Sequence, residues 1–456
     1  MKRRFAVQLL GVLLAVVAAT LAVAGLAGGT VFGPPVKVTP PLAGGYEPGL
    51  VIDGFNNIFA TAHKENALLL LSPDPDSPTY TRSMSWDWIS TDGGNTFTDL
   101  PGLTAASLEQ HEFGDEGDMA LDDVGHLYFV DTNVADDTIT RWSVTGLGKV
   151  TLDLTRPLIP AAQLVDDRPW VVAHGNGHVF YFGNEGDKVT YPLGMGQGGG
   201  FGPGRYTMYA SYDGAQTFNT FGYTLKDSGW CRPAADHAAG SPYVYAFCTN
   251  DGGSDDVITD VNALGTLWSF VSRDDGATFE RYQAGTYKAL DSTTSWPSLY
   301  VSSDGSLWAL YVDATALDAN GNPLGNKLML YHSTDHGQTW KAQDVTPKAG
   351  FYHYAWVNVS NDGRKLGLAC YYRASTSAPW KVYGAVFKPG QIPSLVSLDD
   401  FNPVAPADAD PPGDFLECAF GPDGRLHVVW TRDEIRVSTD LASATLFRDI
   451  YTAASQ

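Results

Sequence analysis

The chain has 456 residues, including 49 glycines and 27 prolines, and its formal net charge is −22. Such an acidic chain lacks the basic face that nucleic-acid binding requires, so we predict no nucleic-acid partner. The glycine and proline content, together with 12% aromatic residues, is typical of many short strands joined by turns.

Residues 1–28 have the pattern of a targeting segment. Basic residues at positions 2–4 precede an apolar run from Phe5 to Ala27, as in a secretory signal. The run is also nearly long enough to span a bilayer. We therefore predict an exported chain, either secreted after cleavage or anchored at the extracellular surface by this segment. The Pro- and Gly-rich residues 29–44 form either a linker or a closing strand.

One turn motif, Ser-x-Asp-x-Gly-x-Thr-aromatic, recurs along the chain. It occupies residues 90–97, 211–218, 272–279 and 333–340, with Ala215 in place of glycine in the second copy. The short Asp side chain accepts hydrogen bonds from its own turn, and the glycine position favours a positive φ. We predict hairpin turns braced by four structural aspartates: Asp92, Asp213, Asp274 and Asp335.

The spacing of these aspartates indicates the length of a repeated unit. The last three lie 61 residues apart, the first two lie 121 apart, and an eroded copy at Asp440 follows two shorter steps later. Counting these steps yields seven units.

A second repeat, of paired short strands separated by an Asp-, Gly- or Asn-rich turn, also occurs seven times. The first strands of the pairs are expected at 47–53, 119–122, 169–173, 232–233, 297–301, 356–359 and 416–420. Each unit must stack on its neighbours to bury both faces. We therefore predict an all-β fold over residues 45–456, a seven-bladed β-propeller with four-stranded antiparallel blades.

The four turns resemble the Asp-box (BNR) repeats of the sialidase superfamily, and the resemblance covers nearly all of the chain after the leader. It implies that the boxes lie on the outer rim, away from the ligand. The superfamily includes exo-sialidases, other glycoside hydrolases, and non-catalytic receptor ectodomains and assembly factors. Its sialidases carry a Phe/Tyr-Arg-x-Pro motif, and the equivalent stretch here is Tyr46-Glu47-Pro48, with glutamate in the arginine's place. This departure argues against sialidase activity.

Candidate site residues gather where the inner strands begin, because the first strand of each propeller blade lines the central channel. The ligand-binding candidates are Glu47, Arg168, Arg232, Trp296 and Tyr354. The catalytic candidates are Glu116, Asp118, Asp166, Asp167 and Tyr354. Arginines could hold a carboxylate, aromatic rings could stack on a sugar, and the acids could act as an acid/base pair. The alternative is a ring of mutually satisfied ion pairs that closes the channel.

Four cysteines in an exported chain favour two disulfides. The natural pairs are Cys231 with Cys248 and Cys370 with Cys418, although the sequence allows three pairings. No Cys-x-x-Cys pair occurs, so we predict no metal site and no cofactor. Calcium, held by the channel acids or by the acidic stretch 250–256, is the one alternative.

These observations predict an exported, monomeric propeller that binds an extracellular glycan or a cell-surface polymer through its axial face. The alternative is a secreted glycoside hydrolase of exo-sialidase type that uses carboxylates and arginines at the channel mouth. The sequence leaves open whether the chain is an enzyme.

Overall fold

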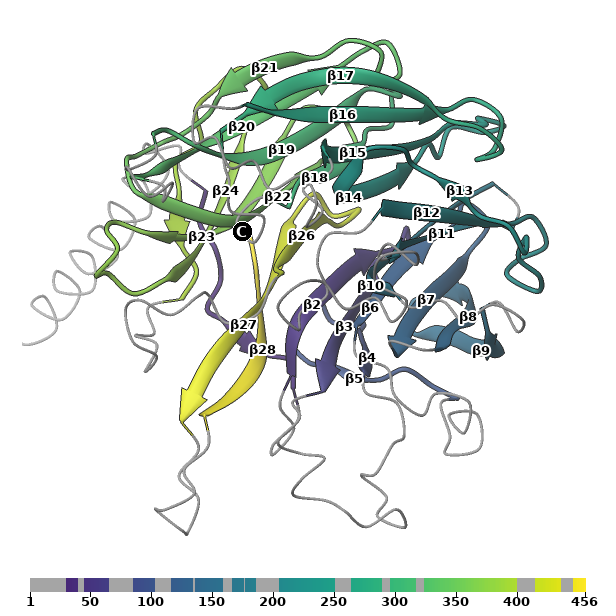
Figure 1. The fold of residues 1–456 in the computed structure, drawn as a ribbon. Coiled ribbons are helices and arrows are strands. Elements are labelled where there is room, and N and C mark those ends of the chain that lie inside the picture. Colours follow the sequence, from purple (N-terminus) through teal and green to yellow (C-terminus); the bar gives the residue numbers. More distant parts are fainter. Residues whose placement is uncertain are drawn as a thin grey trace, which may run out of the picture.

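A computed structural model describes residues 30–39, 45–64, 85–102, 116–133, 136–158, 166–175, 177–185, 205–250, 264–288, 296–316, 324–399, 415–435 and 446–456. Their strands form seven four-stranded antiparallel sheets arranged as a ring (Figure 1). The predicted all-β, seven-bladed propeller is therefore confirmed. No helix in this part of the chain is long and apolar enough to cross a membrane. The predicted targeting segment, residues 1–28, lies outside the described residues.

The blades follow one another along the chain. Blade 1 comprises β2 (Gly45–Ile52), β3 (Ile58–Lys64), β4 (Ser85–Ser90) and β5 (Thr98–Asp99). Blade 2 comprises β6 (Glu116–Leu121), β7 (His126–Asn133), β8 (Asp136–Gly146) and β9 (Lys149–Pro157). Blade 3 comprises β10 (Asp166–His174), β11 (His178–Glu185), β12 (Arg205–Ser211) and β13 (Tyr223–Thr224). Blade 4 comprises β14 (Ser228–Ala235), β15 (Val244–Asn250), β16 (Gly265–Ser272) and β17 (Glu280–Tyr287).

The remaining blades complete the ring. Blade 5 comprises β18 (Ser298–Val301), β19 (Leu307–Ala314), β20 (Asn326–Ser333) and β21 (Lys341–Asp344). Blade 6 comprises β22 (Phe351–Val359), β23 (Leu366–Arg373), β24 (Lys381–Phe387) and β25 (Val396–Ser397). Blade 7 comprises β26 (Glu417–Phe420), β27 (Leu426–Ile435), β28 (Leu446–Ala454) and β1 (Val36–Lys37). Inner strands of neighbouring blades contact one another around the ring: β2 with β6, then β10, β14, β18, β22, β26 and β2 again.

The ring closes by joining the two ends of the described chain in blade 7. The short strand β1 pairs with β28 through Val36 opposite Thr452 and Lys37 opposite Tyr451. The Lys37 ammonium lies 2.6 Å from the carboxylate of the fully buried Asp449. The segment before residue 45 thus supplies the outermost strand of the last blade.

The four repeated turns have the predicted geometry. Each joins the third and fourth strands of its blade, toward the periphery. In the first copy the Asp92 carboxylate accepts hydrogen bonds from the Ser90 hydroxyl and from the backbone N–H and hydroxyl of Thr96. The same three bonds recur at Asp213, Asp274 and Asp335.

The predicted eroded copy at Asp440 is not tested by the structure. Residue 440 lies outside the described residues, but the chain passes it between β27 and β28, the second and third strands of blade 7. The other copies lie between third and fourth strands. The predicted number of seven units is confirmed.

One of the two predicted disulfides is present. Cys231 and Cys248 face each other across β14 and β15 and are bonded. Cys370 and Cys418 are free and buried, so the second predicted pair is wrong. They lie on β23 and β26 of neighbouring blades, and the Cys418 thiol faces the Trp356 carbonyl oxygen at 3.8 Å.

Candidate functional site

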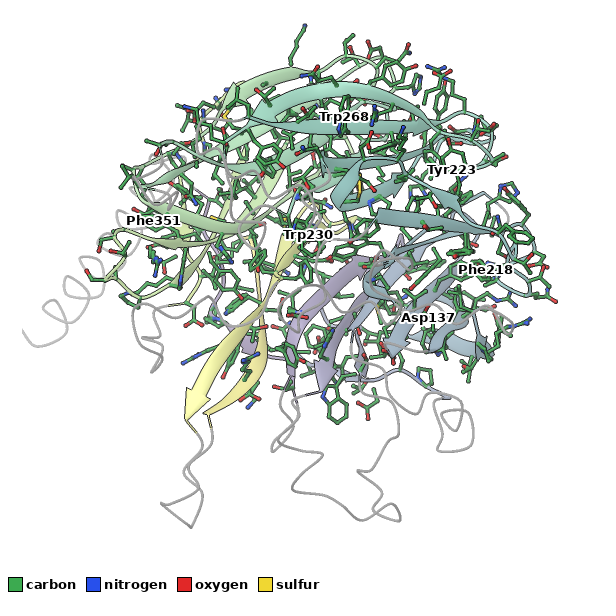
Figure 2. The ribbon with its side chains drawn as sticks, in the orientation of Figure 1. Asp137, Phe218, Tyr223, Trp230, Trp268 and Phe351 are labelled. Atoms are coloured by element: carbon green, nitrogen blue, oxygen red, sulfur yellow. A yellow bond between two sulfur atoms is a disulfide. The ribbon has the colours of Figure 1, made fainter. Side chains whose placement is uncertain are left out.

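Aromatic side chains fill the hub near the point where the inner strands begin. The ring centroids of Trp230 and Trp296 are 4.0 Å apart. Phe415 lies 5.1 Å from Trp296 and 5.3 Å from Trp170. Trp170 also contacts Trp356 at 6.4 Å. Figure 2 labels Trp230 near the centre of the ring. This aromatic hub cluster occupies the axis where the sequence analysis placed an open polar mouth.

Arg232, on β14, carries the charge at the centre of the hub. Its guanidinium lies 4.2 Å from the ring centroid of Trp170 and 4.7 Å from that of Trp356. Its Nη1 is 3.5 Å from Asp118 Oδ2, and its Nη2 is 3.6 Å from Glu417 Oε1. One arginine between two carboxylates leaves little positive charge to attract an anionic ligand.

The two carboxylates also hold neighbouring inner strands together. Asp118 Oδ2 accepts a hydrogen bond of 3.0 Å from the Val171 N–H, and Glu417 Oε2 accepts one of 2.8 Å from the Leu50 N–H. An inner strand has unpaired N–H groups on its channel edge, and a buried N–H needs an acceptor. Uncharged side chains do the same elsewhere, with Ser298 accepting from Val357 N–H and Asn358 from Phe420 N–H.

Burial shifts the protonation of both carboxylates. It raises the pKa of Asp118, although the Arg232 charge opposes the shift. It raises the pKa of Glu417 to about 7, again against the attraction of Arg232 and with the Asp118 charge adding to the rise. A carboxyl group with such a pKa can donate or accept a proton near neutral pH.

The other predicted hub residues are mostly packed inside. Trp296 and Tyr354 are each 4% exposed, so neither ring offers a free face for a sugar. The indole N–H of Trp296 donates to the Cys231 carbonyl oxygen at 3.2 Å. Glu47 is buried with a φ of 54°, and its carboxylate lies 3.6 Å from His63 Nε2. A cavity of about 20 Å³ beside Glu47 has room for about one water molecule.

Several predicted site residues have side chains that lie outside the described part of the structure. The backbone of Glu116 begins β6, and Asp166, Asp167 and Arg168 begin β10, but their side chains are outside the described part. Most of the acidic stretch considered for calcium, residues 251–256, is also outside it.

The large axial cavity lies at the other end of the inner strands. This axial funnel has a volume of about 640 Å³ and is lined by the second halves of the inner strands and the turns that follow them. Arg232 and Glu417 lie at its base, and its walls are mainly apolar. Its rim includes Asp53, Asp123 and His237, together with the exposed Phe55. The cavity therefore opens where these strands end, opposite the mouth that was predicted.

Functional candidates of two kinds were not predicted from the sequence. Glu417 was assigned to an inner strand but not to the site, although a lone acid in the apolar run 415–420 was a usable signal. Within the described residues, the side chains with metal-ligand spacing are His174, His178 and Asp275. The His-x-x-x-His spacing of the first two is present in the sequence, and the prediction of no metal site overlooked it.

No protein-family model matches the chain, and no curated protein sequence matches it significantly. A protein of unknown function from Dyadobacter fermentans has 12% identity and a TM-score of 0.49, over 94% of this chain and 100% of its own. A GH74 enzyme from Niastella koreensis has 14% identity and a TM-score of 0.48, over 87% of this chain and 53% of its own. A Hadza microbial sialidase has 10% identity and a TM-score of 0.45, over 88% and 74%. At these identities the likeness is one of fold.

Proposed function

We propose that the chain is an exported, monomeric Asp-box propeller, related to the sialidase superfamily, that binds an extracellular glycan or cell-surface polymer at its axis. The relationship is supported by four turns with one motif and one set of hydrogen bonds. Export, by secretion or by a membrane tether, is proposed from the charge and hydropathy of residues 1–28.

The axial funnel is the observation that carries the binding proposal. Its volume of about 640 Å³ is within the range of small-ligand sites. Apolar walls suit the faces of sugar rings, while the fixed polar groups of Asp53, Asp123 and His237 at the rim suit hydroxyl groups. A funnel open at one end also fits the terminal units of a longer polymer.

Charge narrows the class of polymer. The chain carries a formal net charge of −22, and the Arg232 guanidinium already faces two carboxylates. An acidic protein repels polyanions at long range. The proposed ligand is therefore a neutral or basic polymer rather than a sialylated or phosphorylated one.

The glycoside hydrolase alternative rests on the carboxyl pair at the hub. Asp118 and Glu417 both have raised pKa values, and that of Glu417, at about 7, suits a general acid. Both groups are nevertheless engaged by backbone N–H groups and by Arg232. Arg232 is the one arginine at the hub among the described side chains, whereas the sialidase pattern requires three.

A binding screen tests the primary proposal. The purified chain is screened against neutral, basic and acidic polysaccharides, and affinity is measured for each ligand retained. Val301 is half-buried in the funnel wall, so Val301→Trp should narrow the funnel and weaken binding. Leu324→Trp, at a position 64% exposed and outside the funnel, should leave binding unchanged. A panel without any ligand, or an affinity that is unchanged in Val301→Trp, contradicts the proposal.

An activity screen tests the alternative. The chain is incubated with fluorogenic aryl glycosides, including the sialoside, and we expect no release of the fluorophore. Turnover that Glu417→Gln abolishes, in a variant whose circular dichroism matches the parent, would replace the binding proposal with the hydrolase.

A further inference from the structure

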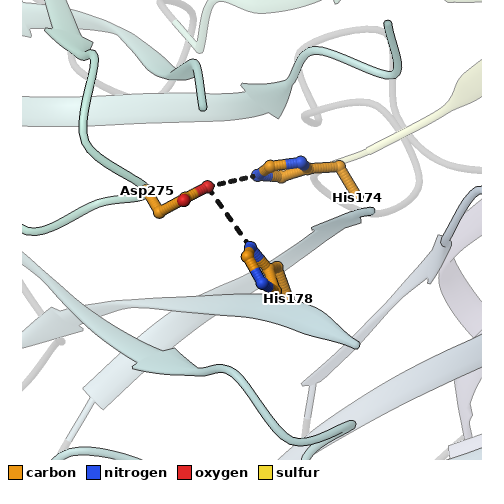
Figure 3. A group of neighbouring side chains, drawn as sticks. All are labelled: His174, His178 and Asp275. Carbon is orange, nitrogen blue, oxygen red and sulfur yellow. Dashed lines mark hydrogen bonds and ion pairs between the residues drawn. The ribbon is translucent and has the colours of Figure 1, made fainter. Parts of the chain in front are cut away.

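A second polar cluster lies between blades 3 and 4, in the turns that follow β10 and β16. His174 and His178 form a register pair across the hairpin of β10 and β11, so their side chains lie on one face of the sheet. Asp275 comes from the turn between β16 and β17 of the next blade. Figure 3 shows its carboxylate directed at both imidazole rings.

The distances within the cluster fit a shared metal ion. Asp275 Oδ1 lies 3.4 Å from His174 Nε2 and 3.3 Å from His178 Nδ1, and the three donor atoms all lie within 4.8 Å of one another. Tetrahedral Zn²⁺ with bonds of about 2.0–2.1 Å separates its ligand atoms by about 3.3–3.4 Å. The two measured separations agree with this geometry.

Other histidine–aspartate pairs in the chain lie closer. His126 Nδ1 is 2.7 Å from Asp122 Oδ2, and His237 Nδ1 is 2.5 Å from Asp123 Oδ1, which are short hydrogen bonds. His178 Nδ1 makes only a longer hydrogen bond, of 3.3 Å, to Asp275 Oδ1. His174 Nε2, in contrast, has no hydrogen-bond partner although the side chain is only 3% exposed. A buried nitrogen left without a partner is unfavourable, and a metal ion would supply the missing contact.

We propose that His174, His178 and Asp275 bind one divalent transition-metal ion, and that this ion is Zn²⁺. Two imidazole nitrogens and one carboxylate suit Zn²⁺, whereas Ca²⁺ and Mg²⁺ prefer sites made of oxygen ligands. The side chains of His178 and Asp275 are about one-third exposed, so water can take the fourth position.

The surroundings hold the donor groups in place. The His174 ring stacks on Phe180 with centroids 5.4 Å apart, and the His178 ring meets Tyr212 edge-on at 5.3 Å. The Tyr212 hydroxyl donates to the backbone oxygen of Asp275 at 2.8 Å. Burial lowers the pKa of His174, which favours the neutral imidazole that a metal requires.

The residue equivalent to Asp275 in the turn of the next blade makes a different contact between blades. His336 occupies the same place in its turn motif as Asp275, with a similar positive φ of 57° against 54°. Its ring stacks on Tyr243 at 4.1 Å and its Nδ1 is 3.0 Å from the Tyr245 hydroxyl. At this position blades 4 and 5 are thus joined by ring packing, whereas blades 3 and 4 meet through two imidazoles and a carboxylate.

Metal binding here would stiffen one side of the funnel rim. Gly175, next to His174, donates its N–H to Asp123 Oδ2 at 2.7 Å. Asp123 in turn holds His237, and both line the funnel. An ion at the cluster would therefore stabilise the turn to which the rim is attached.

Calorimetric titration of tag-free, chelator-treated protein with ZnCl₂ tests the inference. We expect one saturable equivalent, a higher thermal unfolding midpoint with Zn²⁺ than without, and the visible absorption of tetrahedral Co²⁺ when Co²⁺ is used. Asp275→Asn keeps a residue that tolerates positive φ, and His178→Ala changes a partly exposed side chain, so both variants should fold and lose this binding. His336→Ala removes the equivalent inter-blade contact and should retain it.

Three results would overturn the inference. They are the absence of saturable Zn²⁺ binding by the folded protein, binding that persists unchanged in Asp275→Asn and His178→Ala, and equal loss of binding in His336→Ala. Because the readouts are metal binding and thermal stability, they are independent of whether the funnel binds a glycan.

Discussion

At the scale of single residues, the hub depends on charges that are compensated within the protein. Arg232 faces Asp118 and Glu417, and each carboxylate also accepts a backbone hydrogen bond. The sequence placed Arg232 and Asp118 near the axis but did not reveal that they face each other. Among the described side chains, Arg232 and its two carboxylates fit the alternative of mutually satisfied ion pairs better than they fit an open polar mouth.

The buried His427 should make the protein sensitive to acid. It lies on β27, is 0% exposed, and has no hydrogen-bond partner at either ring nitrogen. Burial lowers its pKa to about 4. The unfolded chain, with an ordinary pKa of about 6.5, binds a proton first, so stability is lost as pH falls from about 6.5 to 4, by up to about 3 kcal/mol.

Denaturant unfolding of the parent and of His427→Leu between pH 7.5 and 4.5 measures this effect. The comparison at pH 7.5, where the histidine is neutral in both states, isolates the change in packing. We expect the free energy of unfolding to fall less steeply with acid in the variant. If the free energy of unfolding falls equally with pH in the two proteins, protonation of His427 does not contribute to the loss of stability in acid.

At the scale of elements, the repeated turns are built from local bonds that sequence can predict. Each aspartate side chain bonds to residues no more than two before and four after it. The inner strands are different, because β2, β10, β14 and β22 each contain a bulge or register shift near their beginning. A bulge breaks the alternation of side chains between faces. For this reason a strict alternation of side chains does not predict which positions of these strands pack at the hub.

Removing a turn aspartate should loosen its hairpin. In Asp335→Ala the turn loses three hydrogen bonds to a charged acceptor, from Ser333 and Thr339. The turn is exposed and water replaces part of the loss, so we expect a destabilisation of about 1–2 kcal/mol. Hydrogen exchange should quicken over 333–340. Asp344→Ala, which removes an acceptor for the Thr346 N–H on the same blade, is the control. Equal losses of stability in the two variants would show that the Asp335 hydrogen bonds do not specifically stabilise the turn.

At the scale of the whole molecule, stability depends on joining the first and last strands. Strand β1 covers the edge of β28, and Asp449 is held by Lys37 at 2.6 Å and by the Thr39 hydroxyl at 2.8 Å. An uncovered strand edge invites association, and removing the cationic partner of a buried carboxylate is strongly unfavourable.

Deleting residues 1–39 should therefore open the ring. We expect a loss of about 3 kcal/mol or more, a lower thermal midpoint, and aggregates on size-exclusion chromatography. The matched deletion of residues 1–29 keeps β1 and should behave as the parent chain does. If both deletions melt and elute alike, β1 does not close the propeller.

The sequence by itself determined the class, the number of blades and the braced turns, and it favoured the pairing of Cys231 with Cys248. These features depend on periodicity and on contacts between residues close in the chain, which leave a direct trace in the order of residues. Only the tertiary structure decided that the hub is filled by aromatic rings, that the funnel opens at the far end of the inner strands, and that Cys370 and Cys418 stay apart. It also brought Asp275 to His174 and His178 from another blade. Contacts of this kind join residues far apart in the chain, and their geometry depends on how seven sheets pack, which no local pattern encodes.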